Sequence, residues 1–145
     1  MKTEIIRART AVDMAAVRQI RSQVFILEQQ VPPELEWDEL EERAVHVLCR
    51  RDGAPAAAGR LVVTDGRAKI GRVAVLKRYR GQGLGAAVCR KLIEIAHDEG
   101  AREIYLNAQL HARGFYEKLG FTARGEIFEE AGIDHVRMVY DEPCG

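Results

Sequence analysis

VAVLKRYRGQGLGA, residues 73–86, passes from a short apolar run through a basic, glycine-rich segment into a second apolar pattern. The β-branched side chains of Val73 and Val75 flank a small residue, which is typical of a buried strand. Beyond the glycines, apolar side chains recur at the three- and four-residue spacing of a helix, at Leu84, Val88, Leu92 and Ile95. The segment therefore predicts a strand, a glycine loop and a helix in direct succession.

The start of this helix has the features of an anion-binding site. A helix that begins near Gly85 leaves the N–H groups of its first turn without intrahelical partners, and its dipole places positive charge there. Gly81 and Gly83 carry no Cβ where the backbone turns, while Arg78 and Arg80 add two cationic side chains. We therefore expect a phosphate or pyrophosphate group to bind at this loop.

Two familiar phosphate-binding motifs fit the loop less well. A P-loop requires Lys and Ser or Thr after its last glycine, whereas Ala86 and Ala87 follow Gly85. A dinucleotide fingerprint places its glycines directly after the strand and an acidic residue about 20 residues later, where this chain carries Asn107 and Gln109. A nucleotide-binding or oxidoreductase domain stays open as an alternative, because the glycines also fit the GxGxxA variant.

A third pattern matches at two separate places. Residues 80–85, RGQGLG, match Arg/Gln-x-x-Gly-x-Gly/Ala, the acyl-CoA pyrophosphate loop of the GNAT superfamily of N-acetyltransferases. Residues 114–121, GFYEKLGF, resemble the FYEKLGF segment of the same superfamily. In finer detail, the chain resembles the ElaA/YjcF-like subgroup of small bacterial proteins at residues 24–29, 106–109 and 128–135. The resemblance extends over nearly the whole chain and implies one N-acetyltransferase domain, 1–145.

Composition argues against several other functional classes. The 22 basic and 22 acidic residues give a formal net charge of zero, which is unfavourable for binding nucleic acid through bulk electrostatics. No apolar run approaches the roughly 18 residues of a membrane span, and the N-terminus lacks the apolar core of a signal peptide. We therefore expect a cytoplasmic protein with no nucleic-acid and no membrane partner.

The cysteines form an odd set without the spacing of metal ligands: Cys49, Cys89 and Cys144. Three free thiols in a reducing compartment, and no bound metal, are the expectation.

The order of the elements predicts a mixed α/β (α+β) fold. Strands are expected at residues 3–9, 44–50, 56–63, 69–76, 103–108, 121–123 and 135–140, and helices at residues 10–24, 85–99 and 112–119. Thr10 with Asp13 resembles a capping box, and Asp65-Gly66 predicts a type I′ hairpin turn. The resemblance implies a GNAT-like acyl-CoA acyltransferase fold, with N-terminal antiparallel strands and a splayed parallel pair flanked by helices. Pantetheine would lie between the splayed strands.

The segment 34–42 is strongly acidic and contains one aromatic residue, Trp37. A run of like charges is usually a solvated surface segment, and we expect a solvated loop here. The functional alternative is that some of these carboxylates line a cleft that binds an amine.

Acetyl transfer to an amine needs a bound thioester, a hydrogen-bond donor for the oxyanion, a neutral amine and a proton for the departing thiolate. The resemblance implies that Val73, Ala74 and Val75 pair with pantetheine, and that a backbone N–H there polarises the thioester carbonyl. The remaining cofactor-binding residues implied by the resemblance are Arg80, Gly81, Gln82, Gly83, Leu84, Gly85, Ala86, Asn107, Gln109, Phe115 and Tyr116. Many relatives carry an asparagine where this chain has Gln109.

Tyr116 is the expected general acid. A phenol has a reference pKa of about 10 and a thiol one of about 8.5, so a positioned tyrosine can hydrogen-bond to the leaving sulfur or protonate it. The alternative is a tyrosine that only packs beside Phe115.

The general base has five candidates: Glu28, Glu36, His46, Glu129 and His135. Glu28 follows an apolar run, where burial would raise its pKa, and it is the first choice, with His135 second. His111 is expected to face solvent from a loop.

The function expected from these residues is acetyl-CoA-dependent transfer of an acetyl group to a primary amine of a small molecule or a protein. A non-catalytic acyl-CoA-binding sensor and an acyltransferase for a different acyl-CoA are the alternatives. The resemblance also allows a homodimer.

Overall fold

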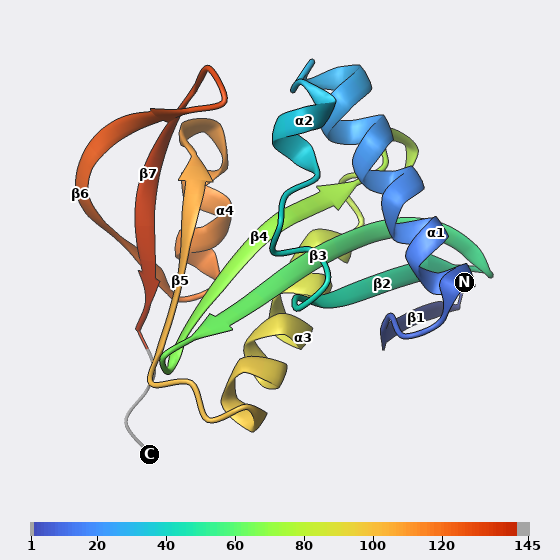
Figure 1. Ribbon diagram of the computed structural model, residues 1–145, viewed down its shortest axis with the longest axis horizontal. Coiled ribbons are helices and arrows are strands. Elements are labelled where there is room, and N and C mark those ends of the chain that lie inside the picture. The colour runs from blue at the N-terminus through green and yellow to red at the C-terminus, as the bar shows by residue number, and fades with distance from the viewer. Residues whose placement is uncertain (1, 142–145) are drawn as a thin grey trace.

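The computed structural model describes residues 2–141, which form a seven-stranded mixed sheet in the order β1-β2-β3-β4-β5-β7-β6 (Figure 1). The strands are β1 (Thr3–Arg7), β2 (Val45–Arg51), β3 (Ala54–Thr64), β4 (Arg67–Val75), β5 (Glu103–Gln109), β6 (Phe121–Glu130) and β7 (Ile133–Tyr140). The α-helices are α1 (Ala11–Arg21), α2 (Pro33–Glu36), α3 (Leu84–Asp98) and α4 (Arg113–Lys118). A π-helix, η1 (Ser22–Glu28), continues α1, and two 3₁₀ turns are η2 (Lys77–Tyr79) and η3 (Leu110–Ala112). The expected mixed α/β fold is confirmed.

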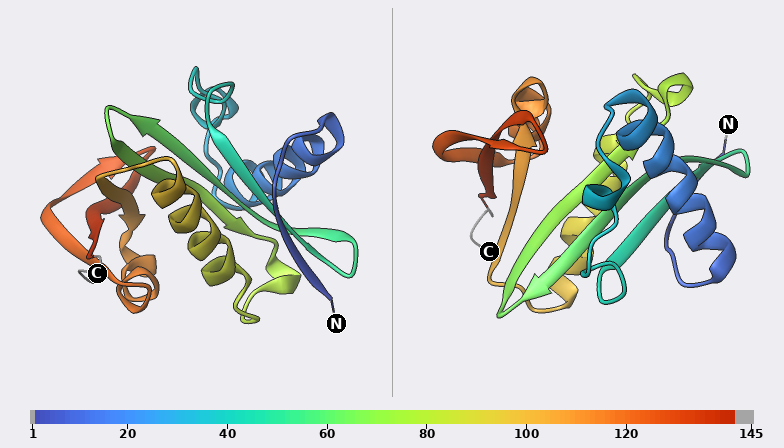
Figure 2. Two further views of the ribbon diagram at one scale, coloured as in Figure 1. Left: turned by 90° about the horizontal axis from the view of Figure 1, so that it is seen from below. Right: turned by 45° about the horizontal axis from the view of Figure 1, so that its top comes forward.

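The helices cover both faces of the sheet, with α3 on one face and α1 on the other (Figure 2). Alternation along β2 explains how one strand serves both layers: Val47 and Cys49 join the core under α3, whereas Leu48 joins the core under α1. At Gly59 on β3, an added Cβ would come within 2.7 Å of α3 side chains. The absence of a side chain there lets α3 approach the sheet closely.

Adjacent strands β4 and β5 run parallel but pair only over their first halves, from Arg67–Glu103 to Ile70–Leu106. Just beyond this point β4 contains a bulge, because Gly71 and Ala74 face residues on β3 that are only two positions apart. Arg72 lies in the bulge with a φ of 53°. Since a bulged strand bends, β4 turns away from β5 and the two strands separate, as the resemblance implied (Figure 1).

Local sequence signals were accurate at the first helix and the central hairpin. Thr10 Oγ1 accepts the Asp13 backbone N–H at 3.1 Å, and the Asp13 carboxylate accepts the Thr10 N–H, which completes the predicted capping box. Asp65 and Gly66 have φ values of 51° and 78°, the two positive angles that a type I′ turn requires.

The prediction for the C-terminal strands was wrong in extent. Instead of a short strand over residues 121–123, β6 runs to Glu130 and forms a long hairpin with β7 through Ala131 and Gly132. Residues 124–130 are all exposed and mostly polar, so they lack the alternating apolar pattern on which a sequence-based prediction depends. Backbone pairing with β7 makes this segment a strand, although its own sequence pattern does not predict one.

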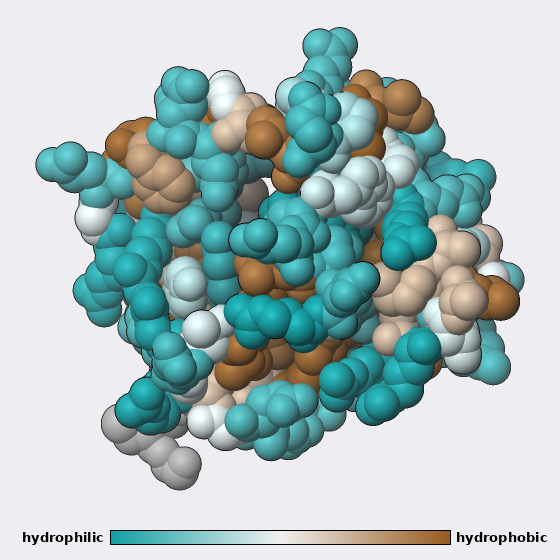
Figure 3. Space-filling view, viewed as in Figure 1, coloured by the Kyte–Doolittle hydropathy of each residue, from teal (hydrophilic) through white to brown (hydrophobic). Residues whose placement is uncertain are grey.

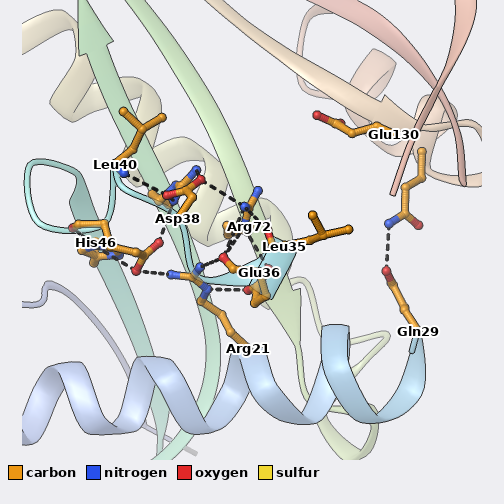
Figure 4. Close-up of polar contacts among 12 residues, drawn as sticks. Arg21, Gln29, Leu35, Glu36, Asp38, Leu40, His46, Arg72 and Glu130 are labelled. Carbon is orange, nitrogen blue, oxygen red and sulfur yellow. Dashed lines mark hydrogen bonds and ion pairs between the residues drawn. The ribbon is translucent and has the colours of Figure 1, made fainter. Parts of the chain in front are cut away.

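The prediction of a solvated loop was wrong for part of the acidic segment. Glu36 is only 2% exposed, and its carboxylate bonds to Arg21 Nε at 2.8 Å and to Arg72 Nε at 2.9 Å. Arg21 lies over the Trp37 ring, 4.7 Å from its centre. These contacts hold α2 against α1 and against the bulge of β4 (Figure 4).

The ion-pair network continues toward β2 and β3. Arg60 NH1 bonds to Asp38 Oδ1 at 2.8 Å and to Glu41 Oε1 at 2.6 Å, and the second oxygen of Glu41 reaches Arg21. His46 Nε2 lies 3.0 Å from the Glu41 carbonyl oxygen. The arginines on the sheet and on α1 therefore hold three carboxylates of this segment, and the other three, on Glu34, Glu39 and Glu42, are exposed as the sequence predicted.

Cys49 and Cys89 are buried free thiols, whereas Cys144 lies outside the described residues. Within residues 2–141, no helix is both long and apolar enough to span a membrane.

Replacing Glu36 with alanine should lower the free energy of unfolding by about 3–5 kcal/mol, because Arg21 and Arg72 would each lose a buried counter-ion. Urea denaturation monitored by circular dichroism measures the change. Glu34→Ala is the matched control: Glu34 is exposed on the same short helix, and its loss should cost no more than about 0.5 kcal/mol. Equal losses in the two variants would refute the structural role of Glu36.

Candidate functional site

A cavity of about 340 Å³ lies where β4 and β5 separate. One wall is the bulged part of β4, the other is the end of β5, and η1 and α2 close one side while the β6–β7 turn closes the other. In the space-filling view of this face, apolar side chains show between hydrophilic ones in the middle of the molecule (Figure 3). The cavity is lined by residues from elements far apart in sequence, so tertiary structure creates it.

The open edge of β4 offers backbone groups to the cavity. The Leu76 N–H bonds to the Ala56 carbonyl on β3 at 2.9 Å. Because amide directions alternate along a strand, the N–H groups of Val73 and Val75 point away from β3, toward the gap, while Ala74 points back to β3. An extended ligand chain in the gap can pair with this edge, and an N–H there can donate to a carbonyl oxygen.

The glycine loop joins this edge to the start of α3. Gly83 is the N-cap of α3 with a φ of 80°, and no side chain caps the helix. Gly81 has the same φ, and a Cβ on either residue would meet no atom within 4 Å. The first-turn N–H groups, carried by Leu84, Gly85 and Ala86, therefore have no side-chain cap and are available to an anion.

Arg80 and Glu28 interact with each other. Arg80 NH2 bonds to Glu28 Oε1 at 3.0 Å, and Arg80 Nε donates to the Val75 carbonyl oxygen at 2.9 Å. Glu28 is absent from the lining of the main cavity and borders a separate hollow beside Lys77 and Arg78. The structure thus gives Glu28 a partner on the glycine loop and does not bring it to the place where an amine would react.

Asn107 and Gln109 both line the cavity from β5. Gln109 Nε2 donates to Gln29 Oε1 at 2.9 Å, which links β5 to the end of η1 across the cavity. The wider turns of the π-helix precede Gln29, and Phe25 and Gln29 both face the cavity. Widened helical turns often occur at functional sites.

Tyr116 lines the cavity from α4, and its ring packs edge-on against Phe115 and Phe121. Burial, and then the neighbouring Cys89 thiol, raise the pKa of the Tyr116 phenol above its usual value. The phenol therefore stays protonated at neutral pH. Phe115 lies over the start of α3, 3.4 Å from the position of a Cβ on Gly85.

His135 is 7% exposed and lines the cavity from β7. Its Nδ1 lies 2.7 Å from the Ile133 carbonyl oxygen, which can only accept a hydrogen bond. Nδ1 consequently carries the hydrogen, and Nε2 is the basic nitrogen of the neutral ring. Nε2 lies 3.6 Å from Glu130 Oε2, and the ring stacks on Phe128.

The other base candidates differ in position. Glu36 lines the cavity but is ion-paired, and burial raises the pKa of its carboxyl although Arg21 opposes the shift. His46 is buried in the ion-pair network outside the cavity lining, and burial lowers its pKa. Glu129 is exposed on β6 and does not line the cavity.

Gln29 and Glu130 are among the cavity residues that were not singled out from the sequence. Both lie within the segments that resemble the ElaA/YjcF-like subgroup, so that resemblance was the available signal. His111 was expected to face solvent; it is exposed in η3 and also lines the cavity. Within the described part of the chain, no group of His, Cys, Asp and Glu side chains is arranged to hold a metal ion.

A family model described as an acetyltransferase (GNAT) domain matches residues 9–142. The uncharacterized N-acetyltransferase YjcF of Bacillus subtilis is 41% identical over 123 residues, which cover 84% of this chain and 88% of that protein. Protein ElaA of Escherichia coli is 33% identical over 128 residues, covering 85% of this chain and 84% of that protein. These matches confirm the resemblance that the two motifs indicated.

A solved structure described as an acyl-CoA N-acyltransferase from Pseudomonas aeruginosa superimposes with a TM-score of 0.83 at 30% sequence identity. The match covers 97% of this chain and 99% of that chain. The fold of the present chain is therefore that of acyl-CoA N-acyltransferases.

Proposed function

The chain belongs to the GNAT family of acetyltransferases, and on that premise we propose that it transfers the acetyl group of acetyl-CoA to a primary amine. One observation carries the proposal: an open strand edge leads directly to an uncapped, glycine-lined helix start. An acyl-CoA has an amide-containing pantetheine arm joined to a pyrophosphate, and these two groups match the two parts of the site. The family leaves no support for the dinucleotide-binding interpretation of the same glycines.

In the proposed complex the pyrophosphate accepts hydrogen bonds from the N–H groups of residues 81–86, and pantetheine pairs with β4. The Val73 or Val75 N–H then donates to the thioester carbonyl oxygen and stabilises the oxyanion. Gln109 and Asn107 form the opposite wall of the gap. Phe115 covers the start of α3 beside the pyrophosphate.

His135 and Tyr116 divide the proton transfers between them. An ammonium ion loses one proton to His135 Nε2, and the neutral amine attacks the thioester carbon, forming the C–N bond. Collapse of the adduct breaks the C–S bond, and the thiolate takes the Tyr116 proton as the phenol receives a proton from the positively charged nitrogen of the adduct. The proton on His135 then leaves to water. His135 thereby takes the role for which Glu28 was the first choice from sequence.

Release of free thiol from acetyl-CoA, measured over a panel of aliphatic, aromatic and peptide amines, tests the activity directly. We expect turnover with at least one amine. Calorimetry with CoA provides the companion measurement. Binding of CoA without turnover on any amine would favour an acyl-CoA sensor. Turnover only with longer acyl-CoA donors would show that acetyl-CoA is not the acyl donor of this enzyme.

Gly83→Ala should weaken CoA binding about tenfold or more, because the new Cβ enters the open anion site and disfavours a φ of 80°. Gly100→Ala is the matched control. Gly100 has a φ of 79° in equally open space at the far end of α3, so it shares the backbone strain without touching the loop. Calorimetric affinities that fall equally in both variants, or in neither, would contradict the assignment of the loop.

Tyr116→Phe should lower kcat about 100-fold, near the lower end of the effect of a general acid, while CoA affinity changes little. Tyr140→Phe removes a phenol hydroxyl outside the cavity lining and serves as the control. If Tyr116→Phe keeps the parental rate at every pH, another group protonates the thiolate.

A further inference from the structure

Two carboxylates line the cavity, Glu36 and Glu130. Glu36 is neutralised by Arg21 and Arg72 at hydrogen-bond distance. Glu130 is different: its side chain is 47% exposed, and within the described residues its ion-pair partner is His135 at 3.6 Å. Glu130 is therefore the lining carboxylate whose charge no arginine compensates.

The hairpin geometry fixes Glu130 and His135 as a pair. Glu130 pairs with Ile133 across the Ala131–Gly132 turn, and the Ile133 carbonyl holds His135 Nδ1. The 3.6 Å between His135 Nε2 and Glu130 Oε2 is longer than a hydrogen bond, so both atoms can accept a donor from a third group. A primary ammonium carries three N–H donors and can satisfy both.

Part of the cavity wall is apolar. Leu35 on α2 and Glu130 on β6 both line the cavity from different elements (Figure 4), and Leu35 is 53% exposed. Phe25 and Val31 continue this wall. An apolar group on the acceptor can cover these side chains and remove their apolar surface from water.

We propose that Glu130 binds the ammonium group of the acceptor, and that the acceptor is a primary amine with an apolar body that is cationic at neutral pH. The inference rests on the proposed acetyl transfer and specifies its substrate class. Glu130 holds the cation beside His135 Nε2, which then removes the proton. Glu130 is thus a substrate-binding residue, and His135 is the base.

Phenethylamine is a suitable probe, because it joins a cationic amine to an apolar ring. Its dissociation constant is measured by NMR titration of the CoA-saturated protein. Glu130→Gln should raise this constant about three- to fivefold, the value of a partly exposed ion pair, while the neutral analogue 2-phenylethanol binds the variant and the parent equally. Glu129→Gln is the matched control, since Glu129 is the adjacent carboxylate outside the cavity lining and should leave both constants unchanged.

Equal affinity of the parent and Glu130→Gln for phenethylamine would overturn the proposal, as would equal weakening by Glu129→Gln or no binding to the parent. Thiol release with acetyl-CoA and phenethylamine separates this outcome from failure of the enzymatic function. Charge-dependent binding that requires Glu130, without turnover of phenethylamine or of any other amine in the panel, would retain the amine site and refute acetyl transfer. Turnover with an unchanged KM for the amine in Glu130→Gln would retain acetyl transfer and refute the role of Glu130.

Discussion

The bulge at Arg72 is the constraint on which the site depends. One extra residue in β4 bends the strand after only four residue pairs with β5, and the cavity opens at that point. A regular β4 strand would pair with β5 along its whole length, and β5 would then occupy the backbone N–H and C=O groups on that edge of β4. The irregularity thus leaves backbone N–H groups available to a ligand.

The same residue ties the bulge to the wall of the cavity. Arg72 Nε bonds to Glu36 at 2.9 Å, and Glu36 in turn bonds to Arg21 on α1. Buried ion pairs contribute little net stability, but breaking one is costly, so such a network favours one arrangement over its alternatives. Here it fixes the short α2 helix, which has too few residues to be stable by itself. The position of Leu35 in the cavity follows from these ion pairs.

The charge at the two ends of the proposed site comes from different groups. At the glycine loop the charge comes from the backbone, because the start of α3 has no side-chain cap and Arg80 is occupied by Glu28 and the Val75 carbonyl. At the β6–β7 turn it comes from side chains, Glu130 and His135. In the proposed complex the pyrophosphate and the ammonium ion would therefore bind at separate places, with the thioester between them.

The sequence by itself determined the mixed fold, the capping box at Thr10, the turn at Asp65-Gly66 and the glycine loop before α3. Each of these features depends on residues that are close together in sequence, where backbone preferences and hydrophobic spacing act. Only the tertiary structure decided the length of β6, the burial of Glu36, the pairing of Glu28 with Arg80 and the meeting of Glu130 with His135 in the cavity. A carboxylate is solvated or buried according to which arginine the fold brings to it, and that partner lies far away in sequence. Local pattern cannot specify such contacts, because their energy exists only once the sheet has assembled.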